Sequence, residues 1–151
     1  MTKPIFVLNG PNLNLLGRRE PHIYGSTTLA EVEASCHERA RALGREVTFR
    51  QSNYEGQIVE WIHEAIDGAT GMVINPGALT HTSVAILDAL KNLSCPIIEL
   101  HISNPHQREA FRHVSYVTPV ATATMCGLGV GGYPLAIEAM DMLVRKARPK
   151  A

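Results

Sequence analysis

The chain is 151 residues long, 45% hydrophobic and 19% charged, which is typical of one globular domain that can bury a core. Its formal net charge is zero at pH 7 and no basic stripe is present, so nucleic acid and anionic membranes are disfavoured as partners. Cys36, Cys95 and Cys126 are scattered without metal spacing, and there is no signal-like N-terminus or membrane-spanning run, so we expect free thiols and a cytoplasmic location.

The first predicted element is a buried strand over residues 5–8, which ends at Asn9 and Gly10. The residues that follow, about 10–25, contain glycines, prolines, asparagines, paired arginines and Tyr24 before the next helix can begin. A loop of this length is unusual in a compact domain and is usually either functional or disordered. Its leucines favour burial over disorder, so we expect an active-site lid. The alternative is an ordinary long surface loop.

Helices and strands then alternate, with glycines, prolines and capping residues at their boundaries. Ser26 or Thr27 can cap the first helix, Gly44 ends it, and Thr80 or Thr82 can begin a later helix. The expected elements are a helix over 29–43, a strand over 46–51, a turn over 52–56, a helix over 58–66, a strand over 71–74, a helix over 80–90, a strand over 96–100 followed by His101, a short helix or turn over 105–112, a strand over 114–117 and a closing helix over 135–143.

This alternation predicts the fold class. The strands are short and apolar throughout rather than amphipathic, which is typical of a parallel sheet with helices on both faces. We therefore expect a single α/β domain over residues 1–151, a flavodoxin-like doubly wound sandwich with a five-stranded parallel sheet in the order 2-1-3-4-5. In such sheets the ligand binds outside the carboxyl ends of the strands.

Polar side chains gather at this carboxyl edge of the predicted sheet. Such a convergence of ionisable and amide groups is the strongest indication of a functional site in the sequence pattern. The residues are Asn9, Asn12, Arg18, Arg19 and Tyr24 after the first strand, Ser52 and Asn53 after the second, Asn75 and His81 after the third, and Glu99, His101, Ser103 and Asn104 at the end of the fourth.

Two groups in this set could carry acid–base chemistry. Glu99 and His101 are two apart on one strand, so their side chains point to the same face and the carboxylate can orient the imidazole. The alternative is a histidine that only caps the strand end. Tyr24 is a poor base at the ordinary tyrosine pKa of about 10, and lowering that pKa towards 7 costs roughly 4 kcal/mol.

Arginines near the tyrosine could supply this free energy. One guanidinium at about 4 Å contributes roughly 4 kcal/mol at an effective dielectric constant of about 20. Arg18, Arg19, Arg108 and Arg112 are all expected near this edge, where they would also attract a carboxylate ligand. Each arginine taken alone could equally be a solvated surface charge.

Other chemistries have less support. The lysines at positions 3, 91, 146 and 150 lie near the termini or at a helix end, which argues against a Schiff base. No Gly-x-Ser-x-Gly, His-Glu-x-x-His or Cys-x-x-Cys pattern is present. Residues 127–132 match Gly-x-Gly-x-x-Gly, but tight packing before the last helix is favoured, because no acidic residue follows at the spacing of a ribose ligand. A flavodoxin-like binding module for nucleotides or small molecules remains the alternative function.

The chain also resembles the type II 3-dehydroquinate dehydratases over nearly its whole length. Five separated motifs in the same order and spacing make this resemblance much more specific than any single pattern above. They are Asn9-Gly10-Pro11-Asn12-Leu13-Asn14-Leu15-Leu16-Gly17 with Arg19-Glu20-Pro21 and Tyr24-Gly25, then Gln51-Ser52-Asn53, then Asn75-Pro76-Gly77-Ala78 with Thr80-His81-Thr82-Ser83, then Glu99 with His101-Ile102-Ser103-Asn104, and finally Arg108 with Phe111-Arg112.

The resemblance implies anti elimination of water from 3-dehydroquinate to give 3-dehydroshikimate through an enolate, with no metal or organic cofactor. The reaction would serve the shikimate pathway of chorismate and aromatic amino acid biosynthesis, or quinate catabolism. The resemblance implies that Tyr24 removes the proton beside the ketone and that Arg19 holds Tyr24 as tyrosinate. Asn12 would stabilise the enolate through an ordered water. His101 would protonate the departing hydroxyl, with Glu99 as its orienting partner.

The resemblance also implies a substrate site and an assembly. Asn75 and the backbone N–H groups of Ile102 and Ser103 would hold the substrate carboxylate. Asp88 would reach the site of a neighbouring subunit in a homo-oligomer, a dodecamer built from trimers. It follows His81 by about two helical turns, so the two could share a helix face. The implied substrate-binding residues are Asn75, His81, Asp88, Ile102, Ser103, Arg112 and, on the lid, Arg108.

Two positions depart from what many members of this family carry. Leu79 stands where a second tyrosine is common, and Tyr54 stands where histidine is common. Neither residue is assigned to the chemical step. We expect them to affect lid packing and inhibitor preference and to leave the reaction unchanged.

Overall fold

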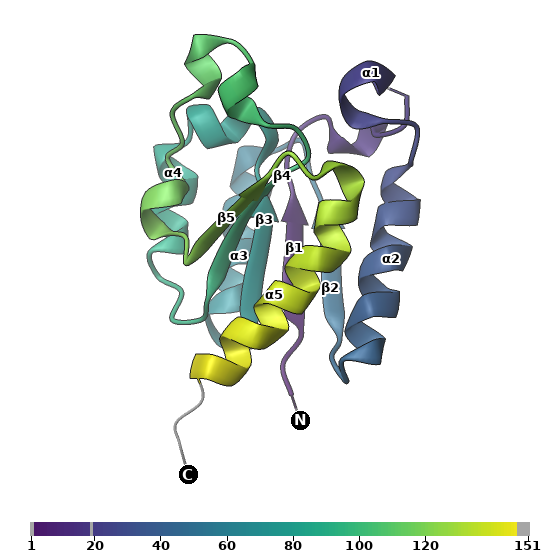
Figure 1. Cartoon of the computed structure of the whole chain (residues 1–151). Helices are drawn as coiled ribbons and strands as arrows, with labels where there is room; N and C mark the ends of the chain where they lie inside the picture. The colour runs from purple at the N-terminus through teal and green to yellow at the C-terminus, as the bar shows by residue number, and fades with distance from the viewer. Residues whose placement is uncertain (1, 19, 148–151) are drawn as a thin grey trace.

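Five parallel strands form one sheet in the order β2-β1-β3-β4-β5, which confirms the predicted topology (Figure 1). The computed structural model describes residues 2–18 and 20–147. The strands are β1 (Ile5–Asn9), β2 (Val47–Gln51), β3 (Gly71–Asn75), β4 (Ile97–His101) and β5 (Ala123–Cys126); the helices are α1 (Pro21–Tyr24), α2 (Leu29–Ala42), α3 (Glu55–Gly68), α4 (Val84–Leu90) and α5 (Gly132–Ala147).

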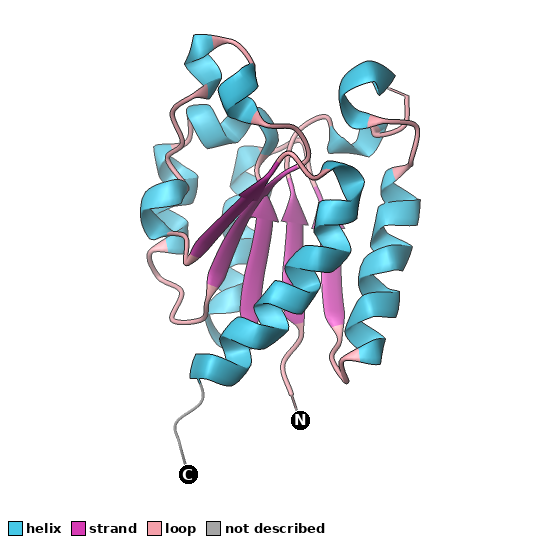
Figure 2. Ribbon diagram, in the orientation of Figure 1, coloured by secondary structure: helices cyan, strands magenta, loops and turns pink. Residues whose placement is uncertain are grey.

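Helices cover both faces of the sheet, with α2 and α5 on one side and α3 and α4 on the other (Figures 1 and 2). Successive residues of a strand point to opposite faces. Ile5 and Val7 therefore pack in the cluster under α2 and α5, whereas Phe6 and Leu8 pack in the cluster under α3 and α4. All residues of β1, β3 and β4 are buried, as expected for largely apolar strands of a sheet that is covered on both faces.

The helix boundaries differ from the predictions at two caps, at one turn and in the closing helix, which spans Gly132–Ala147 and not 135–143. Thr28, and not Ser26 or Thr27, caps α2 through a capping box with Glu31. Ser83 caps α4, where Thr80 or Thr82 was expected, because the preceding residues Gly77–His81 form a separate 3-10 helix. Helix α3 begins inside the predicted turn over residues 52–56. No helix in the described part of the chain is long and apolar enough to cross a membrane.

The predicted strand over residues 114–117 is wrong, because the fifth strand is β5. The Ser115 hydroxyl accepts hydrogen bonds from the N–H groups of Val117 and Thr118, and this local turn replaces ladder hydrogen bonds. The Val117 side chain is fully buried in the cluster under α3 and α4. The segment that suggested a strand therefore forms a turn at Ser115 and an apolar contact at Val117.

The segment over residues 10–25 contains a 3-10 helix, Leu13–Leu15, and the short helix α1. Leu13 and Leu16 are buried, which confirms the burial expected for these two leucines, whereas the same expectation is wrong for Leu15, which is 36% exposed. Glycines allow the close approaches at its base: a Cβ at Gly10 would lie 2.2 Å from the Pro76 carbonyl oxygen, and one at Gly17 would lie 2.7 Å from that of Ser26. The start of the segment therefore packs directly against Pro76, the residue that follows β3. Its action as a lid stays a prediction.

Candidate active site

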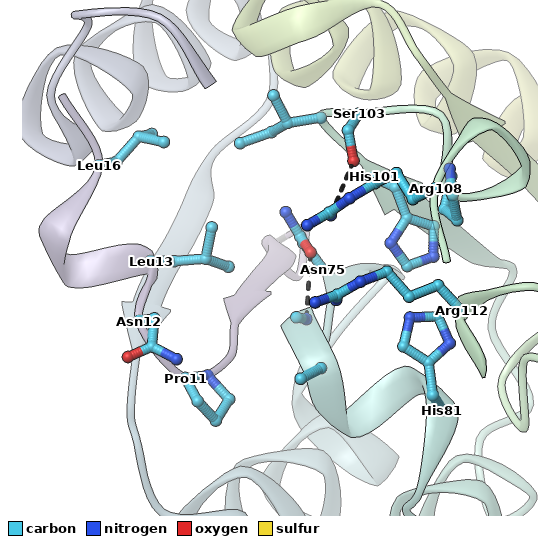
Figure 3. A pocket seen from close by; sticks show the side chains of 14 residues that line it. Pro11, Asn12, Leu13, Leu16, Asn75, His81, His101, Ser103, Arg108 and Arg112 are labelled. Atoms are coloured by element: carbon cyan, nitrogen blue, oxygen red, sulfur yellow. Dashed lines mark hydrogen bonds between the residues drawn. The ribbon is translucent and has the colours of Figure 1, made fainter. Parts of the chain in front are cut away.

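A cavity opens at the carboxyl ends of β1, β3 and β4, where the strand order predicted a ligand site (Figure 3). Its wall combines the start of the 10–25 segment, the 3-10 helix after β3 and the residues after β4. None of the described residues that line it is acidic. The lining residues are Pro11, Asn12, Leu13, Leu16, Asn75, Gly77, Ala78, His81, His101, Ile102, Ser103, Pro105, Arg108 and Arg112.

Glu99 and His101 form a buried pair at the end of β4. The Nε2 of His101 lies 2.5 Å from the Glu99 Oε2, as the shared strand face predicts. The Glu99 carboxylate also accepts hydrogen bonds from the Ser115 hydroxyl at 2.9 Å and the Thr118 hydroxyl at 2.6 Å. With Nε2 engaged, the Nδ1 of His101 is the ring nitrogen left for a ligand in the cavity.

Hydrogen bonds keep this carboxylate ionised despite its burial. Burial alone would raise the pKa of Glu99, but the donors His101, Thr118 and Ser115 together outweigh it, and the pKa lies below its ordinary value. An ionised Glu99 can only accept, so it takes a hydrogen bond from the Nε2–H of His101 and fixes the orientation of the imidazole ring. The pair can therefore hold a proton for transfer to a ligand atom in the cavity.

We expect the free energy of unfolding to fall as the pH drops below about 5, partly because of Glu99. The unfolded chain binds a proton at the ordinary glutamate pKa, whereas folded Glu99 resists it, so acid favours unfolding. Urea titrations between pH 7 and 3 give the free energy of unfolding at each pH. As the pH drops, this free energy should fall less steeply for Glu99→Gln than for the unsubstituted protein. The exposed control Glu38→Gln should retain the original slope. An unchanged slope in Glu99→Gln would contradict this assignment.

Two arginines give the cavity a cationic wall. The guanidinium groups of Arg108 and Arg112 extend into it towards Asn75 (Figure 3). An Nη1 of Arg108 donates to the Ser103 hydroxyl at 3.3 Å, and the Nε of Arg112 donates to the Glu109 carboxylate at 2.5 Å. This side of the cavity suits an anion such as a carboxylate.

The motif at residues 51–53 supports the opposite wall, at Asn12. The backbone N–H of Asn12 donates to the Asn53 side-chain oxygen at 3.0 Å, and Gln51 donates to the same oxygen at 3.1 Å. Asn12 has a φ of 72°, a left-handed conformation that is uncommon for residues other than glycine. The hydrogen bond from Asn12 to Asn53 therefore holds the chain in this conformation beside the cavity.

The predicted link between His81 and Asp88 along one helix is wrong. His81 ends the 3-10 helix Gly77–His81, whereas Asp88 lies in α4, so the two share no helix face. The Nδ1 of His81 lies 2.7 Å from the Val114 carbonyl oxygen, which leaves Nε2 for a ligand. Asp88 is exposed and does not line the cavity.

The side chains of two predicted site residues, Tyr24 and Arg19, lie outside the described part of the chain. Tyr24 is the last residue of α1. Arg19 lies outside the described residues, and Arg18 is exposed and does not line the cavity. Apolar lining residues such as Leu13, Leu16 and Pro105 were not singled out as ligand contacts, because side-chain polarity guided that search.

The glycine-rich residues 127–132 do not line the cavity but pack behind it. A Cβ at Gly127 would lie 3.4 Å from the Asn104 side chain, and one at Gly132 would lie 3.3 Å from the Leu100 side chain. The N–H groups of Gly127 and Gly129 donate to the carbonyl groups of Ser103 and Ile102. The favoured interpretation, tight packing before the last helix, is consistent with these contacts.

Comparison with known proteins gives one family throughout. The family model described as Dehydroquinase class II matches residues 3–141. The 3-dehydroquinate dehydratase of Phenylobacterium zucineum is 55% identical over 145 residues, which cover 96% of this chain and 100% of the relative. That of Streptomyces avermitilis is 57% identical over 149 residues, which cover 98% and 94%.

Solved structures agree with the sequence relatives. The crystal structure of type II dehydroquinase from Propionibacterium acnes has a TM-score of 0.90 to this chain at 50% identity, and the match covers 94% of this chain and 98% of that one. The type II dehydroquinase from Butyrivibrio crossotus has the same TM-score at 45% identity, with 93% and 98% covered. The shared fold and near-complete coverage agree with the five sequence motifs, four of which contribute residues to the cavity wall. The chain therefore belongs to the class II dehydroquinase family.

Proposed function

We propose that the chain catalyses the dehydration of 3-dehydroquinate to 3-dehydroshikimate by anti elimination of water through an enolate, without a metal or organic cofactor. The observation that carries this proposal is the buried Glu99–His101 pair beside a cavity with a cationic wall and no acidic lining among the described residues. Its relatives named 3-dehydroquinate dehydratase cover the same length. The reaction would serve the shikimate pathway or quinate catabolism.

The first chemical step is removal of the proton beside the ketone. Tyr24 takes this proton as a tyrosinate that Arg19 stabilises, and the electron pair of the broken C–H bond forms an enolate. The negative charge that develops on the ketone oxygen needs donors placed in advance. Asn12, which Asn53 holds beside the cavity, stabilises this oxygen through an ordered water.

The second step is loss of the hydroxyl group. The enolate electron pair forms the new carbon–carbon double bond while the carbon–oxygen bond breaks. His101 gives a proton to the departing hydroxyl, and water leaves. The ionised Glu99 keeps the ring of His101 oriented for this transfer. A proton then passes from Tyr24 to His101 through solvent, which restores both groups.

The substrate carboxylate binds at the end of β4. The carbonyl of Ile102 points to the N–H of Gly129. Because C=O and N–H point in opposite directions across a trans peptide, the N–H of Ser103 points away from the glycine-rich segment. This N–H, that of Ile102 and the Asn75 amide hold the carboxylate. His81 and Arg112 contact the rest of the substrate, and Arg108 closes the site with the 10–25 lid.

Ultraviolet absorbance tests the reaction directly. The product is a conjugated enone, so absorbance should rise when the purified protein is mixed with 3-dehydroquinate. The rise should survive prior treatment with borohydride in the presence of substrate, because no lysine adduct forms. Loss of the rise after borohydride would indicate a Schiff base and overturn the residue assignments. No rise at all from a folded protein would favour the binding-module alternative.

We also propose that the protein is cytoplasmic and assembles as a dodecamer of trimers, in which Asp88 reaches a neighbouring site. Its cysteines are free thiols, which suits a reducing compartment. Large apolar side chains are exposed on α4 and on the segment after β4, namely Val84, Phe111, Val114 and Tyr116. Clustered exposed apolar residues are typical of protein–protein interfaces.

Replacing Asp88 by alanine should weaken the trimer or raise KM by about tenfold, which corresponds to about 1.4 kcal/mol. The substitution removes a charge that would lie between a subunit and its neighbour's substrate. Mass by light scattering and steady-state kinetics would measure the two effects. Glu60→Ala, which removes an exposed acid from α3, is the matched control. Unchanged mass and unchanged KM in Asp88→Ala would mean that α4 does not form this interface.

A further inference from the structure

A chain of buried hydrogen bonds runs from β2 through α5 to the cavity. The side-chain nitrogen of Asn9 donates to the Arg50 carbonyl at 3.0 Å. The Tyr133 hydroxyl donates to the Asn9 side-chain oxygen at 2.7 Å, and the Asn75 side-chain nitrogen donates to the Tyr133 oxygen at 2.9 Å. Asn9 and Tyr133 are fully buried and Asn75 is 4% exposed. Of the three side chains, only that of Asn75 lines the cavity.

The direction of this chain is fixed at its far end. A backbone carbonyl can only accept, so Asn9 must turn its NH₂ group towards Arg50 and its oxygen towards Tyr133. The phenol has one proton, which goes to that oxygen. Its own oxygen is then left as an acceptor, and Asn75 must face it with an N–H group. Each orientation follows from the one before it.

The same reasoning leaves one donor of Asn75 for a ligand. The Asn75 side-chain oxygen accepts the N–H of Gly77 at 3.2 Å, drawn as a dashed line in Figure 3. An asparagine amide can flip by 180°, which exchanges its oxygen and nitrogen. A flipped amide would place an oxygen where Tyr133 needs a donor and would bring a carbonyl oxygen close to any bound carboxylate.

We infer that Tyr133 is a positioning residue that fixes the Asn75 amide so that its second N–H faces the substrate carboxylate in the cavity. This inference rests on the proposed function, in which Asn75 binds that carboxylate. Tyr133 acts through Asn75 and does not touch the substrate. None of the α5 side chains lines the cavity, so Tyr133 is the residue through which this helix can influence substrate binding.

The surroundings of Tyr133 suit this role and exclude a role as base. Burial raises the pKa of Tyr133 far above its ordinary value, and the hydrogen bond from Asn75 only partly offsets that effect. The phenol therefore keeps its proton over the working range of pH. A permanently protonated hydroxyl always donates to Asn9 and always accepts from Asn75.

Tyr133→Phe tests the inference, because it removes the hydroxyl and keeps the ring. We expect KM for 3-dehydroquinate to rise about tenfold, as for an unpaired buried amide, with kcat changed by less than about twofold. Asn75→Ala should raise KM by at least as much. In the double variant, Tyr133→Phe should add no further increase, since its target is gone.

Val144→Ala is the matched control, because it lowers stability from the same helix and the same buried cluster at a distance from the cavity. It should lower Tm without changing KM. Asn9→Ala is a second route to the same result, since it removes the acceptor that orients the phenol. Asn9→Ala should raise KM as Tyr133→Phe does. It therefore tests the inference even if Tyr133→Phe does not fold.

The outcomes separate this inference from the proposed function. A Tyr133→Phe enzyme with lowered Tm and unchanged KM would overturn the positioning role while leaving the dehydratase assignment intact. The inference would also be overturned if Tyr133→Phe raised KM by the same factor in the Asn75→Ala background as in the otherwise unsubstituted protein. Unchanged KM in Asn75→Ala would remove the carboxylate contact from the proposed function and the inference with it. Absence of turnover in the unsubstituted protein would overturn both.

Discussion

Replacing Tyr24 by phenylalanine should lower kcat at least about a thousandfold, because the enzyme loses its proposed general base. A proton beside a ketone is weakly acidic, and the ionisable groups in the described cavity wall are histidines and arginines. The nearby phenol Tyr133 cannot substitute, since burial raises its pKa and its hydroxyl is bound to Asn9 and Asn75. KM should change little, as the carboxylate contacts do not involve Tyr24.

The measurement is the rate of enone formation, together with exchange of the substrate hydrogen beside the ketone in deuterated solvent. Both should be lost in Tyr24→Phe, because the first step fails. Far-ultraviolet circular dichroism should be unchanged. Tyr54→Phe is the matched control, since Tyr54 is 77% exposed and has no proposed role in the reaction, and it should retain full activity. A kcat of Tyr24→Phe above about a tenth of that of the unsubstituted protein would show that another group is the base.

Much of the fold could be predicted because its strands carry strong local signals. β1 and β3 are apolar runs that end in asparagine, and β4 is apolar apart from Glu99 and its last residue, His101. Their alternation with helices then predicts a parallel sheet. β5 has a weak signal, because its sequence Ala123–Cys126 is short and only partly buried at the sheet edge. The nearby β-branched residues 114–117 gave the stronger local pattern and so the wrong strand.

This error matters for the site, because the misassigned segment supplies partners to Glu99. Ser115 and Thr118 both donate to its carboxylate, and a strand over 114–117 would not have suggested this contact. The pairing of Glu99 with His101 was predictable, since it depends only on strand periodicity. The environment that keeps Glu99 ionised was not predictable from the sequence, because it comes from a turn whose position depends on tertiary packing.

The hydrogen-bond chain behind Asn75 was invisible for a similar reason. Asn9 follows the first strand and was noted as a polar residue of the sheet edge, but its partner Tyr133 lies 124 positions away in the chain. An aromatic residue at the start of the last helix looks like any core residue in sequence. Only the folded structure, in which α5 packs against β3 and β4, shows that the Tyr133 hydroxyl lies between two amides.

His101→Ala should leave proton removal intact and block loss of water. The proposed base, Tyr24, is untouched, so the enolate should still form and return to substrate. Elimination needs an acid for the departing hydroxyl, and its absence should lower kcat by about a hundredfold to ten-thousandfold. The variant should fold, because Glu99 keeps its hydrogen bonds from Ser115 and Thr118.

Deuterium exchange separates the two steps. In deuterated solvent, His101→Ala should incorporate deuterium beside the ketone of recovered 3-dehydroquinate while enone absorbance rises very slowly. Tyr24→Phe should show neither process, so the pair of variants assigns one residue to each step. His63→Ala, an exposed histidine of α3, should react normally in both assays. Normal elimination by His101→Ala would refute its role as the acid. If both exchange and elimination were lost, His101 would be needed before the enolate forms.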